Sequence, residues 1–244
     1  MRNTADIIGV FVDKVTMDEA LKITRAFLQE ASVHAIYTPN SEIMMAAQRD
    51  PYLKKILNEA DLLVADGAGV VLASKILKRF LPEKVSGIDL VKNIFESPGK
   101  TPVNVFLFGS KPGIAEEAGI NILKLYPNVR IAGCHHGYFK KEEEPDIIEA
   151  INSSNADILL VALGAPKQEK WIHENKSKLK VKVCIGVGGT LDVFAGKAKL
   201  APEFFRRNGL EWLYRLYREP RRFIRMLDLP KFILLTLWTR IRGK

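Results

Sequence analysis

The sequence has few cysteines and no long apolar run, and each lack excludes a class of protein. Cys134 and Cys184 are the only cysteines among 244 residues, so a disulfide framework is excluded and a reducing compartment is expected. No stretch of about 18 consecutive apolar residues occurs, so no membrane-spanning helix is predicted. Met1–Phe11 has no apolar run with a small-residue cleavage site, so no signal peptide is expected. These lacks predict a soluble protein of the cytoplasm.

Several chemical signatures are also missing. The sequence contains no G-x-x-x-x-G-K-[ST] phosphate loop and no G-x-S-x-G nucleophile elbow. It contains no D-x-D, the carboxylate pair that commonly holds a metal–diphosphate complex. Gly186-Val187-Gly188-Gly189 does not complete a dinucleotide fingerprint, because Leu191 stands where the third glycine is required. A departing diphosphate would therefore have to be met by Lys, Arg and backbone N–H groups.

The charge of the chain is concentrated at one end. The net charge is +9, and residues 197–244 alone carry 13 Lys or Arg against 4 Asp or Glu. Residues 1–196 are therefore neutral. A basic tail on a neutral core predicts an anionic partner for the tail alone. We accordingly expect an α/β catalytic core over 1–196 and an amphipathic basic appendage over 197–244.

The first part alternates short apolar runs with amphipathic segments. Seven runs are typical of strands buried on both faces, because they are apolar throughout rather than alternating. They are Ile7–Val12, Val33–Tyr37, Leu62–Ala65, Val103–Phe108, Asn128–Ala132, Asp157–Leu163 and Val181–Val187. Helix starts are signalled by a capping box at Thr16–Glu19 and by Asp50-Pro51. The pattern predicts an α/β fold: a Rossmann-like, mostly parallel sheet with helices on both faces, plus a C-terminal helical basic appendage.

The loops after the strands are the expected ligand site, because open parallel sheets bind ligands at the carboxyl ends of their strands. Small residues there let a ligand approach the backbone, and polar residues can contact it. Each such turn also needs glycine, proline or asparagine for its own geometry. The candidates that follow predicted strands are Thr38, Asn40, Asp66, Gly109, Tyr138, Lys167, Gln168, Gly188, Gly189 and Asp192.

Asp66 is the best candidate for a catalytic base. It ends the run Leu62–Ala65 and precedes Gly67, so its carboxylate is expected at the ligand edge of the sheet. A carboxylate within about 3 Å of a hydroxyl can take its proton. The same carboxylate is also suited to cap a helix that starts near Gly69, and position alone favours neither role.

Other loop residues combine a binding role with a structural one. Thr38 and Asn40 are placed to orient a sugar or phosphate, or else to cap the helix expected at Ser41–Gln48. The glycine turn at 186–189 resembles a phosphate-binding turn at the start of a helix. Asp192 suits a ribose hydroxyl or the first helical turn, where a carboxylate is favoured.

The tail carries arginines at helical spacing. Arg215, Arg218, Arg222 and Arg225 recur at intervals of 3, 4 and 3 residues, with apolar residues between them. Phe232–Trp238 is apolar but too short to span a bilayer, and three cations follow it. The pattern is typical of an interfacial helix on an anionic membrane surface; the alternative is a helix packed on the core with its cations in water. Nucleic acid is not expected as a partner, because the apolar residues are mostly aliphatic and clustered.

Taken together, these residues resemble the TagA/WecG/CpsF family of bacterial glycosyltransferases. The matching stretches cover nearly the whole chain: Thr38-Pro39-Asn40, Ala65-Asp66-Gly67, Leu81–Asp89, His136–Phe139, Leu163–Glu169, Gly186–Gly189 and Gly209–Leu216. One position departs from the family pattern, because Lys84 stands where arginine is expected. Lysine cannot form a bidentate phosphate contact.

The resemblance implies an inverting, metal-independent hexosyltransferase without a cofactor. Its substrates would be a UDP-N-acetylhexosamine and a polyprenyl-diphosphate-linked GlcNAc. The TagA branch looks most similar, which implies transfer of N-acetylmannosamine to GlcNAc-diphospho-undecaprenol for the linkage unit of wall teichoic acid. The WecG branch uses the corresponding uronic acid, and CpsF-like members serve capsule or exopolysaccharide synthesis.

The resemblance also implies roles for single residues. Asp66 becomes the base, Thr38 a substrate-orienting residue and Gln168 a sugar contact. Arg215, Arg222 and Arg225 would reach the acceptor's diphosphate or the departing UDP. The further substrate-binding candidates are Asn40, Lys84, Gly109, Tyr138, Lys167, Gly188, Gly189 and Asp192.

The lipid-linked acceptor sets the expected location of the enzyme. A polyprenyl chain stays in the bilayer, so the protein should lie peripherally on the inner face of the cell membrane, with the tail docking it and completing the site. The oligomeric state stays open, and a homo-oligomer is compatible with the sequence. Two rival functions stay open as well, a nucleotide-binding oxidoreductase and a membrane adaptor without catalytic activity.

Overall fold

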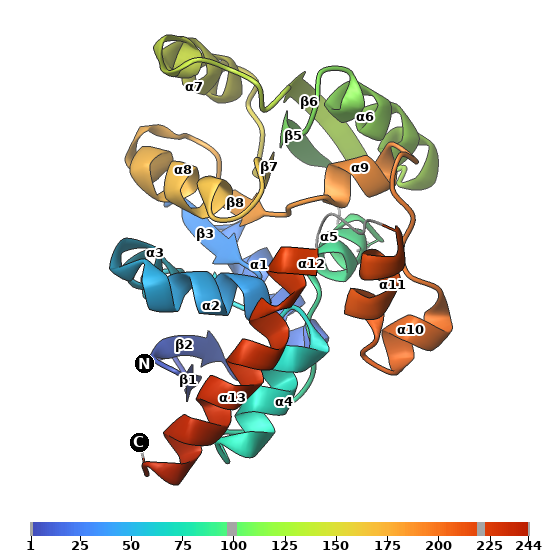
Figure 1. Ribbon diagram of the computed structural model, residues 1–244. Helices are drawn as coiled ribbons and strands as arrows, with labels where there is room; N and C mark the ends of the chain where they lie inside the picture. The colour runs from blue at the N-terminus through green and yellow to red at the C-terminus, as the bar shows by residue number, and fades with distance from the viewer. Residues whose placement is uncertain (1, 97–101, 219–222, 244) are drawn as a thin grey trace.

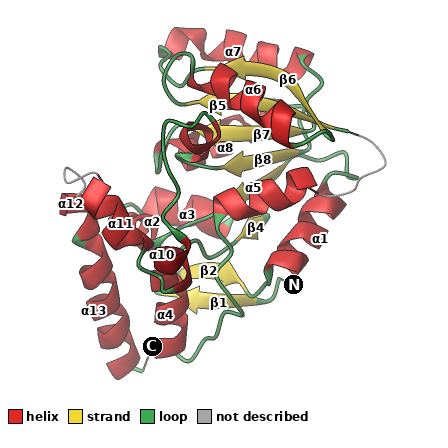
Figure 2. Cartoon of the chain, turned by 90° about the vertical axis from the view of Figure 1, so that its right-hand side faces the viewer, coloured by secondary structure: helices red, strands yellow, loops and turns green. Residues whose placement is uncertain are grey.

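The computed structural model describes residues 2–96, 102–218 and 223–243, apart from the side chains of Arg215, Ile224 and Arg225. In these residues six strands form a sheet in the order β4-β3-β8-β7-β5-β6, and every pairing is parallel. The strands are β3 (His34–Tyr37), β4 (Leu62–Leu63), β5 (Val103–Gly109), β6 (Val129–His135), β7 (Ile158–Ala162) and β8 (Val183–Gly186). Figure 2 shows β6, β5, β7 and β8 stacked as parallel arrows. The predicted α/β fold is confirmed.

Helices cover both faces of the sheet. Alternate residues of a strand point to opposite faces, so each face presents apolar side chains that a layer of helices buries. Along β7, Leu159 and Val161 join one buried cluster, whereas Ile158 and Leu160 join the other. The first cluster contains residues of α2 (Ser41–Arg49), α3 (Pro51–Asn58), α7 (Glu144–Ser153) and α8 (Lys167–Asn175). The second contains residues of α1 (Met17–Phe27), α5 (Gly87–Glu96), α6 (Ile114–Leu125) and α9 (Thr190–Phe194). Burial on both faces explains why the strand runs are mainly apolar.

Local sequence signals explain where two of these helices begin. Thr16 and Glu19 form the predicted capping box of α1, with Thr16 Oγ1 accepting from the Glu19 amide at 3.2 Å. Asp50 caps α3 by accepting from two amides of its first turn, and Pro51 is the first helical residue. These caps satisfy N–H groups that a helix start leaves without partners inside the helix.

One predicted strand is wrong. Ile7–Val12 is not a single strand of the main sheet but contributes to the antiparallel pair β1 (Thr4–Ile7) and β2 (Val10–Asp13). The chain turns at Ile8 and Gly9, whose φ angles are 49° and 84°. Isoleucine rarely adopts a positive φ, and Ile8 is buried like Ile7 and Val10, so the hydrophobic pattern gives no sign of the turn.

The chain after residue 196 forms helices that pack on the rest of the protein. They are α10 (Glu203–Arg207), α11 (Glu211–Arg218), α12 (Phe223–Met226) and α13 (Asp228–Ile241). Figure 1 shows α13 running beside α4 (Ala68–Ile76), and α13 contacts both α4 and α2. Phe232 on α13 is fully buried in the same cluster as α2, so apolar burial holds this helix on the core. Among the described residues, every helix is too short or too polar to span a bilayer.

Candidate functional site

Two adjoining pockets open at the carboxyl ends of the strands, the edge that the sequence predicts. The first has a volume of about 730 Å³ and is bordered by the loops after β5, β6, β7 and β8. The second, of about 480 Å³, is bordered by the loops after β3, β4, β7 and β8 and by residues beyond 196. Both are bordered by Gly164, Gly188 and Gly189, so they meet at the turns after β7 and β8. Their volumes are those of small-molecule sites.

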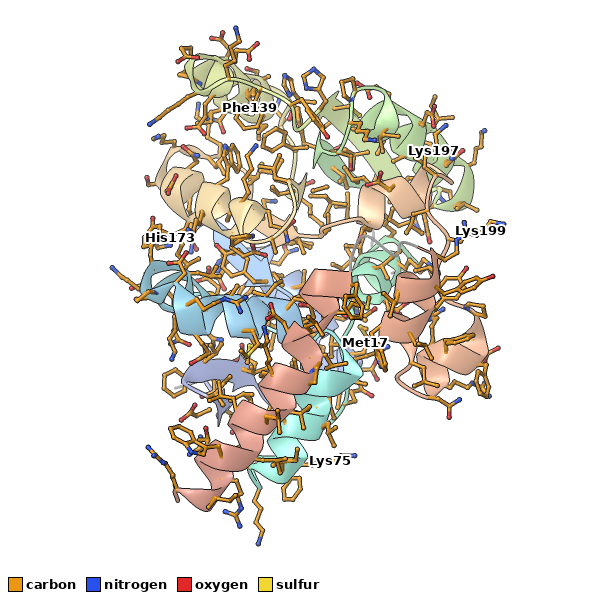
Figure 3. All side chains as sticks on the ribbon, viewed as in Figure 1. Met17, Lys75, Phe139, His173, Lys197 and Lys199 are labelled. Carbon is orange, nitrogen blue, oxygen red and sulfur yellow. The ribbon has the colours of Figure 1, made fainter. Side chains whose placement is uncertain are left out.

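The first pocket combines cations with aromatic rings. Lys111, Lys140 and Lys167 line it together with Tyr138 and Phe139. Lys167 Nζ lies 4.8 Å from the centre of the Phe139 ring, which Figure 3 shows near α7. Tyr138 is 66% exposed, so its ring is accessible to a ligand. Three ammonium groups and two aromatic faces suit an anionic ligand that carries a planar ring.

Asp192 lies in the first turn of α9, which confirms its predicted helical position, and it also lines the first pocket. Its Oδ2 accepts from Ser110 Oγ at 2.9 Å, which ties the loop after β5 to the turn after β8. Ser110 and Lys111 also line this pocket, and the sequence predictions named neither as a site residue. Their position shortly after a predicted strand is the sequence signal that could have identified them as site residues.

Gly109 is a predicted substrate-binding residue that borders neither pocket among the described residues. Its φ is +132°, and a Cβ at this position would lie 2.4 Å from the backbone of Ala162. Glycine is therefore required for the close pairing of β5 and β7. The direct role of Gly109 is in the packing of the sheet edge rather than in the lining of the pocket.

Asp66 lines the second pocket, and the helix-cap alternative for it is wrong. α4 begins at Ala68 with Gly67 as its N-cap, and no described side chain caps it. Asp66 Oδ2 instead accepts from the amide of Gly87 at 3.3 Å, and its own amide donates to the carbonyl oxygen of Pro39 at 3.1 Å. These contacts fix the carboxylate at the carboxyl end of β4, beside the pocket.

Thr38 and Asn40 follow β3 and line the same pocket. Asn40 Oδ1 accepts from the amide of Ile43 at 3.1 Å, so its predicted capping of α2 is confirmed. Thr38 Oγ1 donates to the carbonyl oxygen of Gly186 at 3.5 Å, and a Cβ on Gly87 would lie 2.9 Å from this hydroxyl. The hydroxyl is therefore held between the end of β8 and the start of α5.

Gln168 connects the second pocket to the glycine turn. It is largely buried, it lines the pocket, and its Oε1 accepts from the amide of Gly188 at 3.0 Å. One N–H group of the predicted phosphate-binding turn is therefore already bound by a side chain. Gly189 precedes α9 and borders both pockets.

Three ion pairs of the described residues join the core to the C-terminal helices around the second pocket. The contacts are Lys84 Nζ to Glu211 Oε1 at 3.0 Å, Arg206 to Asp89 Oδ1 at 3.1 Å, and Arg49 to Asp228 Oδ2 at 2.8 Å. In each pair one partner precedes residue 196 and the other follows it. The hydrogen bond from Arg49 lowers the pKa of Asp228. Lys84 is thus paired, and none of the other five residues was predicted from the sequence as a site residue.

The three arginines predicted to contact a diphosphate lie outside the described part of the chain. This holds for the whole of Arg222 and for the side chains of Arg215 and Arg225. From residues 197–244, Lys199 and Arg206 are the described cations that line the second pocket. Figure 3 shows Lys199 in the loop between α9 and α10. Within the described ranges no group of three or more His, Cys, Asp or Glu is arranged to hold a metal ion.

Comparison with known proteins finds relatives along nearly the whole chain. A model of the glycosyl transferase WecG/TagA/CpsF family matches residues 5–244. A Bacillus spizizenii protein named N-acetylglucosaminyldiphosphoundecaprenol N-acetyl-beta-D-mannosaminyltransferase is 34% identical over 223 residues, which are 91% of this chain and 86% of that protein. A Staphylococcus aureus protein with the same name is 36% identical over 235 residues, 95% of this chain and 92% of its own.

Proposed function

The chain belongs to the WecG/TagA/CpsF family of glycosyl transferases, and we propose from that premise that it moves N-acetylmannosamine from its UDP derivative to GlcNAc-diphospho-undecaprenol. The names of the relatives suggest the sugar and the acceptor. The observation that carries the proposal is the meeting of two pockets at Gly188 and Gly189, with Asp66 lining one of them. A transferase has to bring two substrates together beside a base, and two adjoining pockets suit that task.

The donor suits the first pocket. A UDP-sugar carries a planar uracil, a ribose and a diphosphate, and the pocket offers Tyr138, Phe139, Asp192 and three lysines. Aromatic rings stack with the base, a carboxylate accepts from ribose hydroxyls, and ammonium groups pair with phosphate oxygens. The donor sugar then points toward Gly188 and Gly189, where the second pocket begins.

Asp66 acts as the general base in this proposal. A hydroxyl of the acceptor's GlcNAc gives its proton to the Asp66 carboxylate and attacks the anomeric carbon of the donor sugar. The bond from that carbon to the UDP oxygen breaks, and its electron pair leaves with UDP. One displacement of this kind inverts the anomeric configuration. Gly87 holds one oxygen of the base in place, and Thr38 lies beside it to orient the sugar.

The departing diphosphate is neutralised by side chains rather than by a metal in this proposal. The lysines that line the first pocket pair with the phosphate oxygens in this proposal, and Lys199 and Arg206 add charge at the second pocket. Arg215, Arg222 and Arg225 belong to the same C-terminal segment and are assigned the same task. The active site is then assembled from both sides of residue 196.

The acceptor's lipid tail requires docking on a membrane, and α13 offers a face for it. Leu234, Leu237 and Trp238 are exposed at helical spacing, whereas Phe232 and Thr236 are buried against the core. Figure 3 shows Lys75 at the end of α4 beside this helix, and each cation near an anionic surface adds about 1 kcal/mol of attraction. We assign the protein to the inner face of the cell membrane as a peripheral enzyme.

A transfer assay tests the proposal. The full chain is incubated with UDP-N-acetylmannosamine and a short-chain polyprenyl-diphosphate-GlcNAc, and released UDP is measured with and without EDTA. We expect UDP release that depends on the acceptor and is unchanged by EDTA. The product should carry the anomeric configuration opposite to that of the donor. Loss of turnover in EDTA, restored by a divalent cation, would contradict the metal-free mechanism.

The same assay separates the alternatives. Preference for the uronic acid donor would assign a WecG-like activity, and use of another acceptor would point to capsule or exopolysaccharide synthesis. Binding of UDP without transfer to any lipid-linked acceptor would support the adaptor. Oxidation of NAD(P)H would support an oxidoreductase and refute the transferase.

A further inference from the structure

A buried carboxyl group lies next to the second pocket with one oxygen unpaired. Glu169 follows Gln168 in the first turn of α8, and only 1% of it is exposed. Its Oε1 accepts from Gln168 Nε2 at 2.9 Å, while its Oε2 has no hydrogen-bond partner among the described residues. Burial raises the pKa of Glu169, so this carboxyl keeps its proton to higher pH than a solvated one.

Such a group costs stability rather than adding to it. A buried polar atom without a partner loses its hydration and gains no protein hydrogen bond in return. Methionine has a similar size and would fill the same space without that loss. Packing therefore does not explain why Glu169 is a carboxylic acid.

The orientation of the neighbouring amide does explain it. Gln168 Oε1 accepts from the amide of Gly188 at 3.0 Å, while Gln168 Nε2 donates to Glu169. Turning this amide over would set Nε2 against the Gly188 N–H, donor against donor. The Glu169 oxygen therefore stabilises the one orientation in which Gln168 accepts from Gly188.

The same amide is confined by the end of β8. A Cβ on Gly186 would lie 2.9 Å from Gln168 Nε2, and the Thr38 hydroxyl donates to the Gly186 carbonyl oxygen. The start of α8 is tied to β3 by Tyr37, whose hydroxyl donates to the Glu169 carbonyl oxygen at 3.3 Å. This row of contacts ends at the glycine turn that borders both pockets.

We infer that Glu169 is a positioning residue for the transfer: it holds the Gln168 amide against Gly188 and thereby sets the turn where donor and acceptor meet. Glu169 is not among the described residues that border either pocket, so it acts through Gln168. Its effect on turnover rests on the proposed function, whereas its effect on the Gly188 amide does not.

Two substitutions of Glu169 test the inference. Glu169→Met removes the acceptor for Gln168 Nε2, whereas Glu169→Gln retains one. For Glu169→Met we expect kcat/KM to fall about tenfold and the Gly188 amide hydrogen, followed by NMR, to exchange about tenfold faster. Its melting temperature should be equal to that of the wild type or higher. Glu169→Gln should recover most of the turnover and the slow exchange.

The double variant with Gln168→Ala separates positioning from a general packing role. If Glu169 acts through Gln168, Glu169→Met changes neither kcat/KM nor Gly188 exchange in the Gln168→Ala protein. Additive losses would overturn the inference. So would a Glu169→Met protein that fails to fold, or one with unchanged turnover and unchanged exchange.

Asn175→Leu is the matched control. Asn175 is another buried polar residue of α8, about two turns further from the pocket, and donates to the Trp171 carbonyl oxygen at 3.1 Å. We expect a lower melting temperature, with kcat/KM and Gly188 exchange within about twofold of the wild type. A wild-type protein that transfers no sugar would refute the proposed function alone, because Gly188 exchange still tests the positioning.

Discussion

The two pockets are built in different ways, although they share the turns after β7 and β8. All described residues that line the first pocket precede residue 196, and its loops directly follow strands of the sheet. The second pocket is lined by core residues and by residues between Ala198 and Asp228, which three ion pairs and α13 attach to the core. The first pocket therefore depends on the sheet alone, whereas the second depends on a joint between two parts of the chain.

The largest expected effect separates the chemistry of the second pocket from binding in the first. Asp66→Asn removes the base, and we expect kcat to fall by about 10²- to 10⁴-fold, while UDP affinity measured by calorimetry stays unchanged. Asp192→Asn is the counterpart in the first pocket and should weaken UDP binding instead. Near-normal turnover of Asp66→Asn would remove this residue from the mechanism.

The next largest effect is expected on membrane binding by the exposed side of α13. Leu234→Glu together with Trp238→Glu places charges on the exposed side of α13, and we expect binding to anionic vesicles to weaken about a hundredfold. The variant should still transfer sugar to a water-soluble acceptor at the wild-type rate. Ile120→Glu with Leu123→Glu on α6 is the control, because these residues are also exposed and apolar. Equal loss of vesicle binding in both proteins would contradict the assigned docking face.

A smaller effect is expected from breaking one ion pair of the joint. Arg206→Gln removes the partner of Asp89 and a cation of the second pocket, so the KM for the lipid acceptor should rise about tenfold at unchanged UDP affinity. Arg207→Gln is the control, because Arg207 is exposed and pairs with Glu203 inside α10. Steady-state kinetics with the acceptor varied measures both. An equal rise of the acceptor KM in the two variants would show that acceptor binding depends on the overall positive charge and not on the ion pair between Arg206 and Asp89.

The smallest effect is a pH dependence at the turn that both pockets share. Burial holds the pKa of Glu169 above its usual 4.5, so the folded protein keeps a proton that the unfolded chain releases above that pH. Unfolding of the wild type therefore becomes easier as pH rises from 4.5 toward the folded pKa. The Glu169→Gln protein has no carboxyl group at this position and does not lose stability in this way as the pH rises.

We expect the stability of Glu169→Gln relative to the wild type to rise with pH over this window, by no more than about 1.4 kcal/mol per pH unit. Urea denaturation at about pH 5 and about pH 8 measures the difference. A stability difference that is the same at both pH values would mean that Glu169 ionises in the folded protein as it does in the unfolded chain.

Much of the core follows from sequence because its signals are local. Parallel strands with helices on both faces must be apolar on both sides, which the runs at 103–108 and 157–163 display directly. Asp50 with Pro51, and Thr16 with Glu19, mark helix starts through contacts within three residues. The ligand edge then follows from the topology, and it brought Thr38 and Asp66 into one pocket.

The remainder depends on contacts that no short window contains. The partners of the three ion pairs are separated by 117 to 179 residues, so no spacing rule finds them. Asp66 is a residue type that often caps helices, but α4 begins at Ala68 with Gly67 as its N-cap, whose φ is +116°. The Asp66 carboxylate accepts from the Gly87 amide instead. Glu169 stands in a polar stretch, and its burial becomes visible only once α8 is packed.

The crossing of the ion pairs over residue 196 bears on how such enzymes can be recombined. Each pair has its own order of charge: the core supplies the cation to Glu211 and to Asp228 but the anion to Arg206. A C-terminal segment grafted from a relative would have to match this pattern and also supply Lys197, which pairs with Glu117 of the core. A mismatched graft would set like charges beside the sugar site, so the core and the tail of a functional chimera have to be chosen as one unit.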